Sequence, residues 1–170
     1  MVYKAPSSST LETQLARAWA VQVNTGTEEV PEWIFVRGLD SVNPVSEKST
    51  QDDGDIDSEG FGSQIGTEIS FTLTLEGKRK GEHEAETFTA DPGQEYLRLK
   101  GDKTGYEGIG HVRWWRTDGD PEAREMFADV SYQSGGGGKG DLRSFTATLN
   151  SRGKPTDITI PTEPVTTVTP

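Results

Sequence analysis

The stretch TEISFTLTLE, from Thr67 to Glu76, decides the fold class of this chain. Apolar and polar side chains alternate along it with a period of two residues. This period is typical of a β-strand that buries one face and turns the other toward water. The apolar face would contain Ile69, Phe71, Leu73 and Leu75, and the polar face would contain Glu68, Ser70, Thr72, Thr74 and Glu76. The pattern predicts an antiparallel sheet with one buried side.

Weaker alternation on both sides of this stretch predicts further strands, at residues 17–23, 32–37, 39–45, 108–117, 126–133 and 141–150. Pro44 cannot donate to a ladder, so its strand should lie at an edge. Asp91-Pro92 is a helix start, and residues 94–100 would form the single short helix. We therefore expect a mainly β fold, an antiparallel β-sandwich or open barrel with one short α-helix and a long acidic loop.

The domain organisation follows from where this pattern begins and ends. Residues 17–155 would form the β domain, and residues 1–16 a flexible N-terminal arm. Within that arm, Ser9 to Glu12 has capping-box spacing and could open one or two helical turns. Residues 156–170 are β-branched and interrupted by Pro, which suits either an edge strand or a tail.

The apolar content of the chain is low for a domain of this length. Nine Leu, seven Ile, eleven Val and six Phe make 33 of 170 residues, about 19%. A share below ~20% with a net charge of −11 borders on the disordered class. The alternating segments and the four Trp and four Tyr favour a folded sheet instead. We expect a thin core that is completed by contacts with other copies.

Charge and composition exclude several classes of function. A net charge of −11 opposes tight binding to nucleic-acid phosphates, which requires clustered Lys and Arg. The absence of Cys excludes disulfides, thiolate metal sites and cysteine nucleophiles. No apolar run approaches the ~20 residues of a membrane helix. Residues 1–23 lack the apolar segment of a secretory signal, so we expect cytoplasmic assembly and no membrane partner.

The region from Glu47 to Gly66 is acidic and rich in glycine, which predicts a long exposed loop. Its Asp53, Asp55 and Asp57 have the spacing of the first ligands of an EF-hand calcium loop. The glycine of such a loop is replaced by Ser58, and its bidentate glutamate by Gln64. We interpret the region as a solvated loop without a cofactor or metal role.

Patterns for catalysis are also incomplete. Two histidines, His83 and His111, cannot form a three-ligand zinc site without carboxylates. No GxSxG elbow is present, and the glycine run 135–140 lacks the context of a phosphate loop. We therefore expect that the chain is not an enzyme.

Several segments, taken in order, resemble the tail tube (major tail) proteins of lambda-type long-tailed bacteriophages. The similarity covers most of residues 17–155 and rests on order and spacing. It includes a second strand followed by an acidic loop, a long alternating strand, a lone helix, the strand after that helix, and a final strand before a turn. These correspond here to Trp33–Leu39, Asp52–Asp57 with Gly60-Phe61-Gly62, Ser70–Leu73, Asp91–Gly101, His111–Arg116, and Arg143–Leu149 before Gly153-Lys154-Pro155. The glycine tract 135–140 and the basic turn 77–81 depart from the family.

The resemblance implies a structural virion protein that forms hexameric rings, which stack into a hollow tube for DNA. It implies partners as well: further copies of the chain, a tape-measure protein, and tail tip or terminator proteins. DNA would pass without specific binding, and the protein would be located in the virion tail.

Two sets of side chains would serve these contacts. The acidic loop would stack one ring on the next through Asp52, Asp53, Asp55, Asp57 and Glu59, with Lys78, Arg79 and Lys80 as basic partners. The polar face of the long strand, namely Glu68, Ser70, Thr72, Thr74 and Glu76, would line the channel or simply meet solvent. Core or interface positions would be Trp33, Phe71, Trp114, Trp115 and Phe145.

Two other readings of the sequence remain open. A head-tail connector or tail terminator would form rings without stacking indefinitely. A monomeric carbohydrate-binding β-sandwich would use Trp19, Trp33, Trp114 and Trp115 as sugar platforms.

Overall fold

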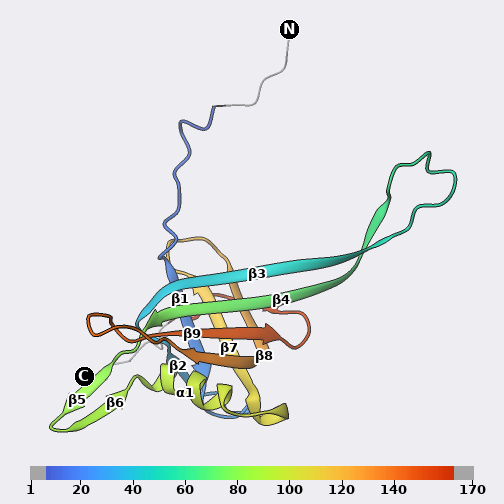
Figure 1. Cartoon of the computed structure of the whole chain (residues 1–170). Helices are drawn as coiled ribbons and strands as arrows, with labels where there is room; N and C mark the ends of the chain where they lie inside the picture. The colour runs from blue at the N-terminus through green and yellow to red at the C-terminus, as the bar shows by residue number, and fades with distance from the viewer. Residues whose placement is uncertain (1–6, 163–170) are drawn as a thin grey trace.

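The fold is an antiparallel sheet that bends over itself (Figure 1), as seen in a computed structural model that describes residues 7–162. The main sheet has eight strands in the order β2-β1-β7-β8-β9-β4-β3, and β10 pairs with β8. One α-helix and one separate two-stranded hairpin complete it. The strands and helix are β1 Trp19–Asn24, β2 Trp33–Phe35, β3 Leu39–Asp52, β4 Gln64–Lys78, β5 Gly81–Glu84, β6 Thr87–Ala90, α1 Pro92–Gly101, β7 Ile109–Arg116, β8 Ala123–Ser134, β9 Ser144–Ser151 and β10 Thr156–Asp157. The predicted mainly β fold with one short helix is confirmed.

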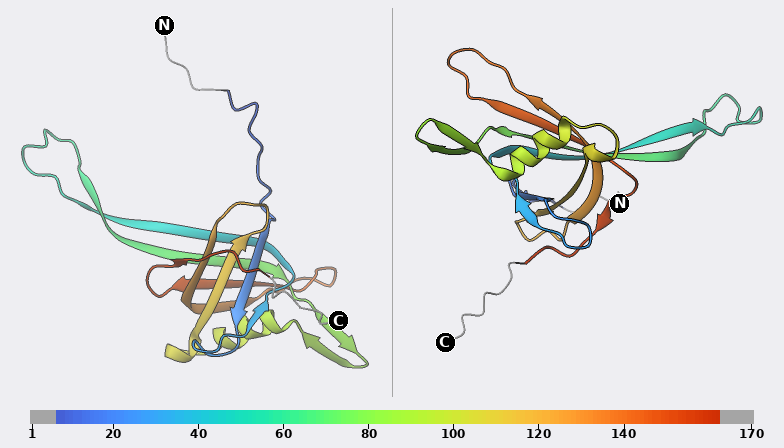
Figure 2. Two further views of the ribbon diagram at one scale, coloured as in Figure 1. Left: turned by 180° about the vertical axis from the view of Figure 1, so that it is seen from behind. Right: turned by 90° about the horizontal axis from the view of Figure 1, so that it is seen from below.

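The sheet bends at β8, which belongs to two pairings. Residues 123–129 of β8 pair with β7, whereas residues 128–134 pair with β9. The β2-β1-β7 half therefore crosses the β9-β4-β3 half at a steep angle, as Figure 1 and Figure 2 show. The two halves enclose the apolar side chains between them, which is an orthogonal sandwich built from one continuous sheet.

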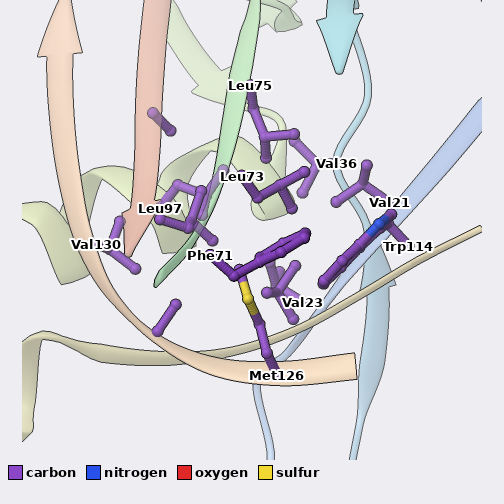
Figure 3. Close-up of a cluster of buried hydrophobic side chains, with 14 residues drawn as sticks. Val21, Val23, Val36, Phe71, Leu73, Leu75, Leu97, Trp114, Met126 and Val130 are labelled. Atoms are coloured by element: carbon purple, nitrogen blue, oxygen red, sulfur yellow. The ribbon is translucent and has the colours of Figure 1, made fainter. Parts of the chain in front are cut away.

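The core lies between these halves (Figure 3). Its largest member is Trp114, which is fully buried and stacks on Phe71 with ring centroids 5.5 Å apart. Around this pair pack aliphatic side chains from both halves, among them Val21, Val23, Leu73, Leu75, Val112, Val130 and Leu149. The alternation in the sequence thus corresponds to burial in the structure.

Helix α1 closes one end of the sandwich and is fastened by polar contacts. Asp91 caps it by accepting from the Gln94 N–H at 3.2 Å, as its N-cap position predicts. The Gln94 side chain is fully buried, and its amide donates to the carbonyls of Arg37 (2.6 Å) and Lys78 (3.0 Å). Its oxygen accepts from the Lys80 N–H, so the Gln94 side-chain amide has partners for both its nitrogen and its oxygen.

The β3–β4 hairpin extends beyond the core as a long projection (Figure 1). We call its distal part, residues 47–69, the arm, and its connecting loop, residues 53–63, the tip. The predicted exposed acidic loop is present but shorter than residues 47–66: it spans residues 53–63, because β3 continues to Asp52 and β4 begins at Gln64. Hydrogen bonds between the two strands pair the backbone groups of residues 47–52 and 64–66, so these residues form strand although their side chains show no regular apolar pattern.

The arm also corrects the predicted burial of Ile69. Phe71 is buried, but Ile69, on the same face one pair further out, is 66% exposed. The reason is that the core ends at Phe71, and the crossing half of the sheet does not reach farther along β4. Alternation signals an apolar face but does not tell where the opposing layer stops.

The two ends of the chain differ from expectation in detail. Residues 7–16 form no helix. They contain one backbone turn, in which the Leu11 N–H donates to the Ser8 carbonyl at 3.0 Å. Residues 156–157 form the edge strand β10. Residues 1–6 of the predicted N-terminal arm and residues 163–170 of the predicted C-terminal tail lie outside the described residues. Across residues 7–162, no helix is both long and apolar enough to cross a membrane.

Candidate assembly surfaces

The outer face of the β3-β4-β9-β8 half is a continuous polar surface. Register places neighbouring positions of the four strands side by side, as in the row Val45, Thr72, Asn150 and Asp129. The face comprises Ser41, Asn43, Val45, Glu47 and Ser49 of β3; Glu68, Ser70, Thr72, Thr74, Glu76 and Lys78 of β4; Ser144, Thr146, Thr148 and Asn150 of β9; and Asp129, Ser131 and Gln133 of β8. The structure therefore gathers the polar side chains predicted on one strand into a surface four strands wide.

The charges on this polar face are mostly negative. Its carboxylates are Glu47, Glu68, Glu76 and Asp129, and its one Lys, Lys78, ends β4 opposite Ser144 and lies 3.5 Å from Asp40. Small hydroxyls occupy most of the rest, and the Thr72 hydroxyl donates to the Asn150 side chain at 3.2 Å. Such a face repels polyanions, and its single Lys already has a carboxylate beside it.

The polar half of the sheet has an unpaired margin at β3. Within the described residues, β3 pairs only with β4, so β3 is an edge strand, as Pro44 predicts. Across the described chain, the edge that faces away from β4 is unpaired along all 14 residues of β3. At the opposite margin, β8 has β9 on one side but loses β7 after Asp129. A long unpaired edge is a template for pairing with another chain.

The tip of the arm is held in a defined shape by local hydrogen bonds. The Asp52 carboxylate accepts from the Gly54 N–H at 2.9 Å, and that of Asp55 accepts from the Asp57 N–H at 3.0 Å. These turns place the predicted stacking carboxylates in solvent: Asp52 ends β3, and Asp53, Asp55, Asp57 and Glu59 lie in the tip. Among residues 7–162, no group of three or more His, Asp or Glu could hold a metal ion.

The predicted basic partners of the tip do not form a free cluster. Arg79 is 8% exposed, pairs with Glu95, and lies 3.3 Å from the Tyr132 hydroxyl. Lys78 lies 3.5 Å from Asp40. Of these three residues, Lys80 alone is exposed and forms no ion pair within residues 7–162. The assignment of Arg79 as a stacking partner was therefore wrong, because that side chain fastens α1 to the sheet.

Glu95 links this buried arginine to a second one. Its carboxylate accepts from Arg98 at 2.6 Å, and this bond, with a smaller contribution from Arg79, lowers the pKa of Glu95 below its ordinary value. A lowered carboxyl pKa stabilises the fold above the unfolded pKa, and this stabilisation is lost as the pH falls through the folded value. Acid should therefore weaken the attachment of α1.

We expect Glu95→Gln to lower the free energy of unfolding at neutral pH by about 1–3 kcal/mol, because Arg79 loses its charged partner. The deficit should shrink as the pH falls through the lowered folded pKa of Glu95, where the wild-type carboxyl itself takes up a proton. Urea denaturation at neutral pH and at a series of acidic pH values measures this, with the exposed Glu107→Gln as the matched control. A deficit that stays constant across this series would contradict the assignment.

The other face of the β1-β7-β8 half carries a layer that sequence reasoning missed. His111 stacks on Phe127 at 4.2 Å and lies 2.8 Å from Glu125, while the Arg113 guanidinium covers the Trp33 ring at 4.1 Å. The sequence signal that could have predicted this layer is the spacing of His111, Arg113 and Trp115, which are two residues apart and therefore share one face of β7. This layer buries most of Trp115.

The predicted core or interface aromatics thus lie on both sides of the sheet. Phe71, Trp114 and Phe145 are buried in the interior, whereas Trp33 and Trp115 lie on the outer layer. A sugar platform of four tryptophans is not formed: Trp114 is inside, and arginines cover Trp33 and Trp19.

Comparison with solved structures identifies the fold. No protein-family model and no curated protein matches the sequence. The tail of an empty gene transfer agent (GTA) particle, refined with C6 symmetry, matches with a TM-score of 0.63 and 12% identity over 86% of this chain and 99% of that chain. The SPP1 tail tube matches with a TM-score of 0.54 and 12% identity over 82% and 76%. A chain of the anti-feeding prophage (AFP) baseplate matches with a TM-score of 0.51 and 12% identity over 84% and 93%.

These likenesses define a class of fold: the chain has the fold found in the tails of phage-like particles. At such identities the comparisons bear on architecture alone. The resemblance to tail tube proteins is confirmed at that level, and its narrower lambda-type form stays a prediction.

Proposed function

We propose that this chain is a tail tube subunit, a structural protein that assembles into stacked rings around a channel for DNA. The observation that carries the proposal is the four-stranded polar face, on which four carboxylates outnumber one Lys, Lys78, at the end of β4. In a monomer such a face would need no excess of negative charge. Around a channel, the same face would keep DNA from adhering to the wall.

Rings would close through the free margins of this half of the sheet. The outer edge of β3 in one copy would pair with the region of β8 beyond Asp129 in the next, because both leave backbone groups without a sheet partner. This contact joins two different surfaces of neighbouring subunits. Such a contact gives a closed ring when the rotation that relates one subunit to the next adds up to a full turn. The C6 symmetry stated for the GTA tail supports six copies.

The electrostatics of such a ring would favour sliding. Six copies with a net charge of −11 carry about 66 negative charges, and the polar faces would turn carboxylates toward the channel. Binding to DNA gains free energy mainly when Lys and Arg neutralise phosphates and release the counterions of DNA into solution. This wall would offer a single Lys per copy, Lys78, and that side chain already lies beside Asp40. DNA would therefore pass without specific binding.

Assembly would place the protein in a virion tail, made in the host cytoplasm, with a tape-measure protein and tip or terminator proteins at its ends. The acidic tip would contact a neighbouring ring. Single rim ion pairs contribute only about 0–1 kcal/mol, so the contact would depend on repetition around the ring.

Electron microscopy of the purified protein tests the proposal. Hollow tubes of stacked rings are the expected result at high protein concentration. Single rings that never stack would favour a terminator or connector instead. A compact monomer at every concentration would contradict both.

A further inference from the structure

The tip carries two large apolar side chains that the chain itself leaves uncovered. Ile56 is 99% exposed and Phe61 is 80% exposed, although both belong to a loop with defined hydrogen bonds. Four carboxylates surround them, from Asp53, Asp55, Asp57 and Glu59, and residues 53–63 contain no Lys or Arg. An apolar group in full contact with water is costly, and its cost falls when a partner covers it.

A complementary groove lies at the base of the arm. Its volume is about 470 Å³, and its lining is Ser46, Ile69, Phe71, Arg124, Gly153, Lys154, Pro155 and Asp157. The exposed side chain of Ile69 marks where the core ends, so the apolar floor is open. We call this feature the basal groove.

The rim of the basal groove carries two cations and one carboxylate. The Arg124 guanidinium lies 5.8 Å from the Phe71 ring centroid and 3.1 Å from Asp157, and Lys154 is exposed. The tip is acidic around an apolar centre, and the groove has Arg124 and Lys154 beside an apolar floor, so carboxylates of the tip would meet cations of the groove.

The occupant of the groove must come from a second copy. Within one copy, Ile69 pairs with Lys48, four residues before β3 ends at Asp52. That separation is about 13 Å of extended strand, and the tip projects farther from the core in Figure 1. The arm is a paired hairpin, so it cannot fold back onto its own base without breaking its ladder.

We infer that the tip of one copy docks in the basal groove of another, with Ile56 as the apolar anchor and Phe61 beside it. Asp55 and Asp57 would then face Arg124 and Lys154 of the receiving copy. The inference rests on the proposed function and deepens it, since it names the receptor of the tip in place of the basic turn at 78–80.

Disulfide trapping tests the docking, because the natural chain contains no Cys. Ile56→Cys and Ile69→Cys are made in separately tagged proteins, which are mixed, allowed to assemble and oxidised. The expected result is a dimer band that contains both tags, at least tenfold stronger than in the control mixture of Ile56→Cys with Leu142→Cys. Leu142 is 76% exposed and lies in the β8–β9 loop, away from the arm.

A substitution provides a second readout. Ile56→Ser should raise the protein concentration needed for tubes by about tenfold to a hundredfold, because the anchor loses its apolar burial. Leu142→Ser should leave that concentration unchanged. Tubes that form normally with Ile56→Ser and give no specific disulfide would overturn the docking and leave the proposed function intact. Wild-type protein that never forms tubes would overturn the proposed function and this inference with it.

Discussion

Tubes assembled from Thr72→Lys protein are expected to retain double-stranded DNA that wild-type tubes release. Thr72 lies in the middle of the polar face, with Val45 and Asn150 directly opposite on the neighbouring strands. A lysine there has no carboxylate across the strand to neutralise it. Six copies would place six cations in each ring, repeated along the channel.

The retention should depend steeply on salt. Each phosphate contact contributes a slope of about −0.9 to the dependence of log affinity on log salt, so six contacts should weaken binding by about a thousandfold between 50 and 200 mM salt. Co-sedimentation of labelled DNA with tubes at the two salt concentrations measures this. In intact particles, the same variant should slow DNA release by about tenfold or more.

The matched control is Thr117→Lys, which adds the same charge at an exposed position after β7. It should behave as wild type in both assays. If Thr72→Lys tubes assemble and release DNA as wild-type tubes do, the polar face does not line the channel.

Replacing the tip by a two-residue turn should abolish polymerisation and leave the subunit folded. Asp52 and Gln64 are the last paired residues of the arm, so Asn-Gly in place of residues 53–63 closes the hairpin with a favoured turn. No buried side chain lies in the tip, and the thermal midpoint should move by no more than a few degrees, in line with an uncoupled surface change of about 0.5 kcal/mol.

Loss of tubes is the larger effect, because it removes Ile56, Phe61 and four carboxylates from every copy at once. Light scattering and electron microscopy at matched concentrations measure it, with circular dichroism for the fold. Deletion of residues 136–140 in the β8–β9 loop serves as the control and should leave tubes intact. Normal tubes from the turn variant would show that the tip is not an assembly element.

The strands were predictable wherever local pattern and burial coincide. Leu73, Leu75, Leu149 and Val112 alternate with polar residues in the sequence and are fully buried in the structure. The start of α1 was equally local, since Asp91 and Pro92 cap a helix through their own backbone preferences. These features depend on neighbours a few residues away.

The arm and the attachment of α1 were not predictable in this way. Residues 47–52 have the polar composition of a loop, yet they form strand because they pair with residues 64–70 across the hairpin. The sequence places Arg79 in a basic turn, which is typical of a surface charge. In the structure it is buried, because it forms an ion pair with Glu95 of α1 and a hydrogen bond with the Tyr132 hydroxyl of β8. Long-range contacts override local propensity in both cases.

An acidic antiparallel β protein with no cysteine and with a capped helix can be inferred from the sequence alone, because charge, composition and alternation are local properties. Tertiary contacts set which polar residues share one face and why the core stops at Phe71, before Ile69. They also set how far the acidic tip lies from the groove that contains Arg124. Those features depend on the register of strands distant in sequence and on the bend at β8, and no short stretch of residues encodes either.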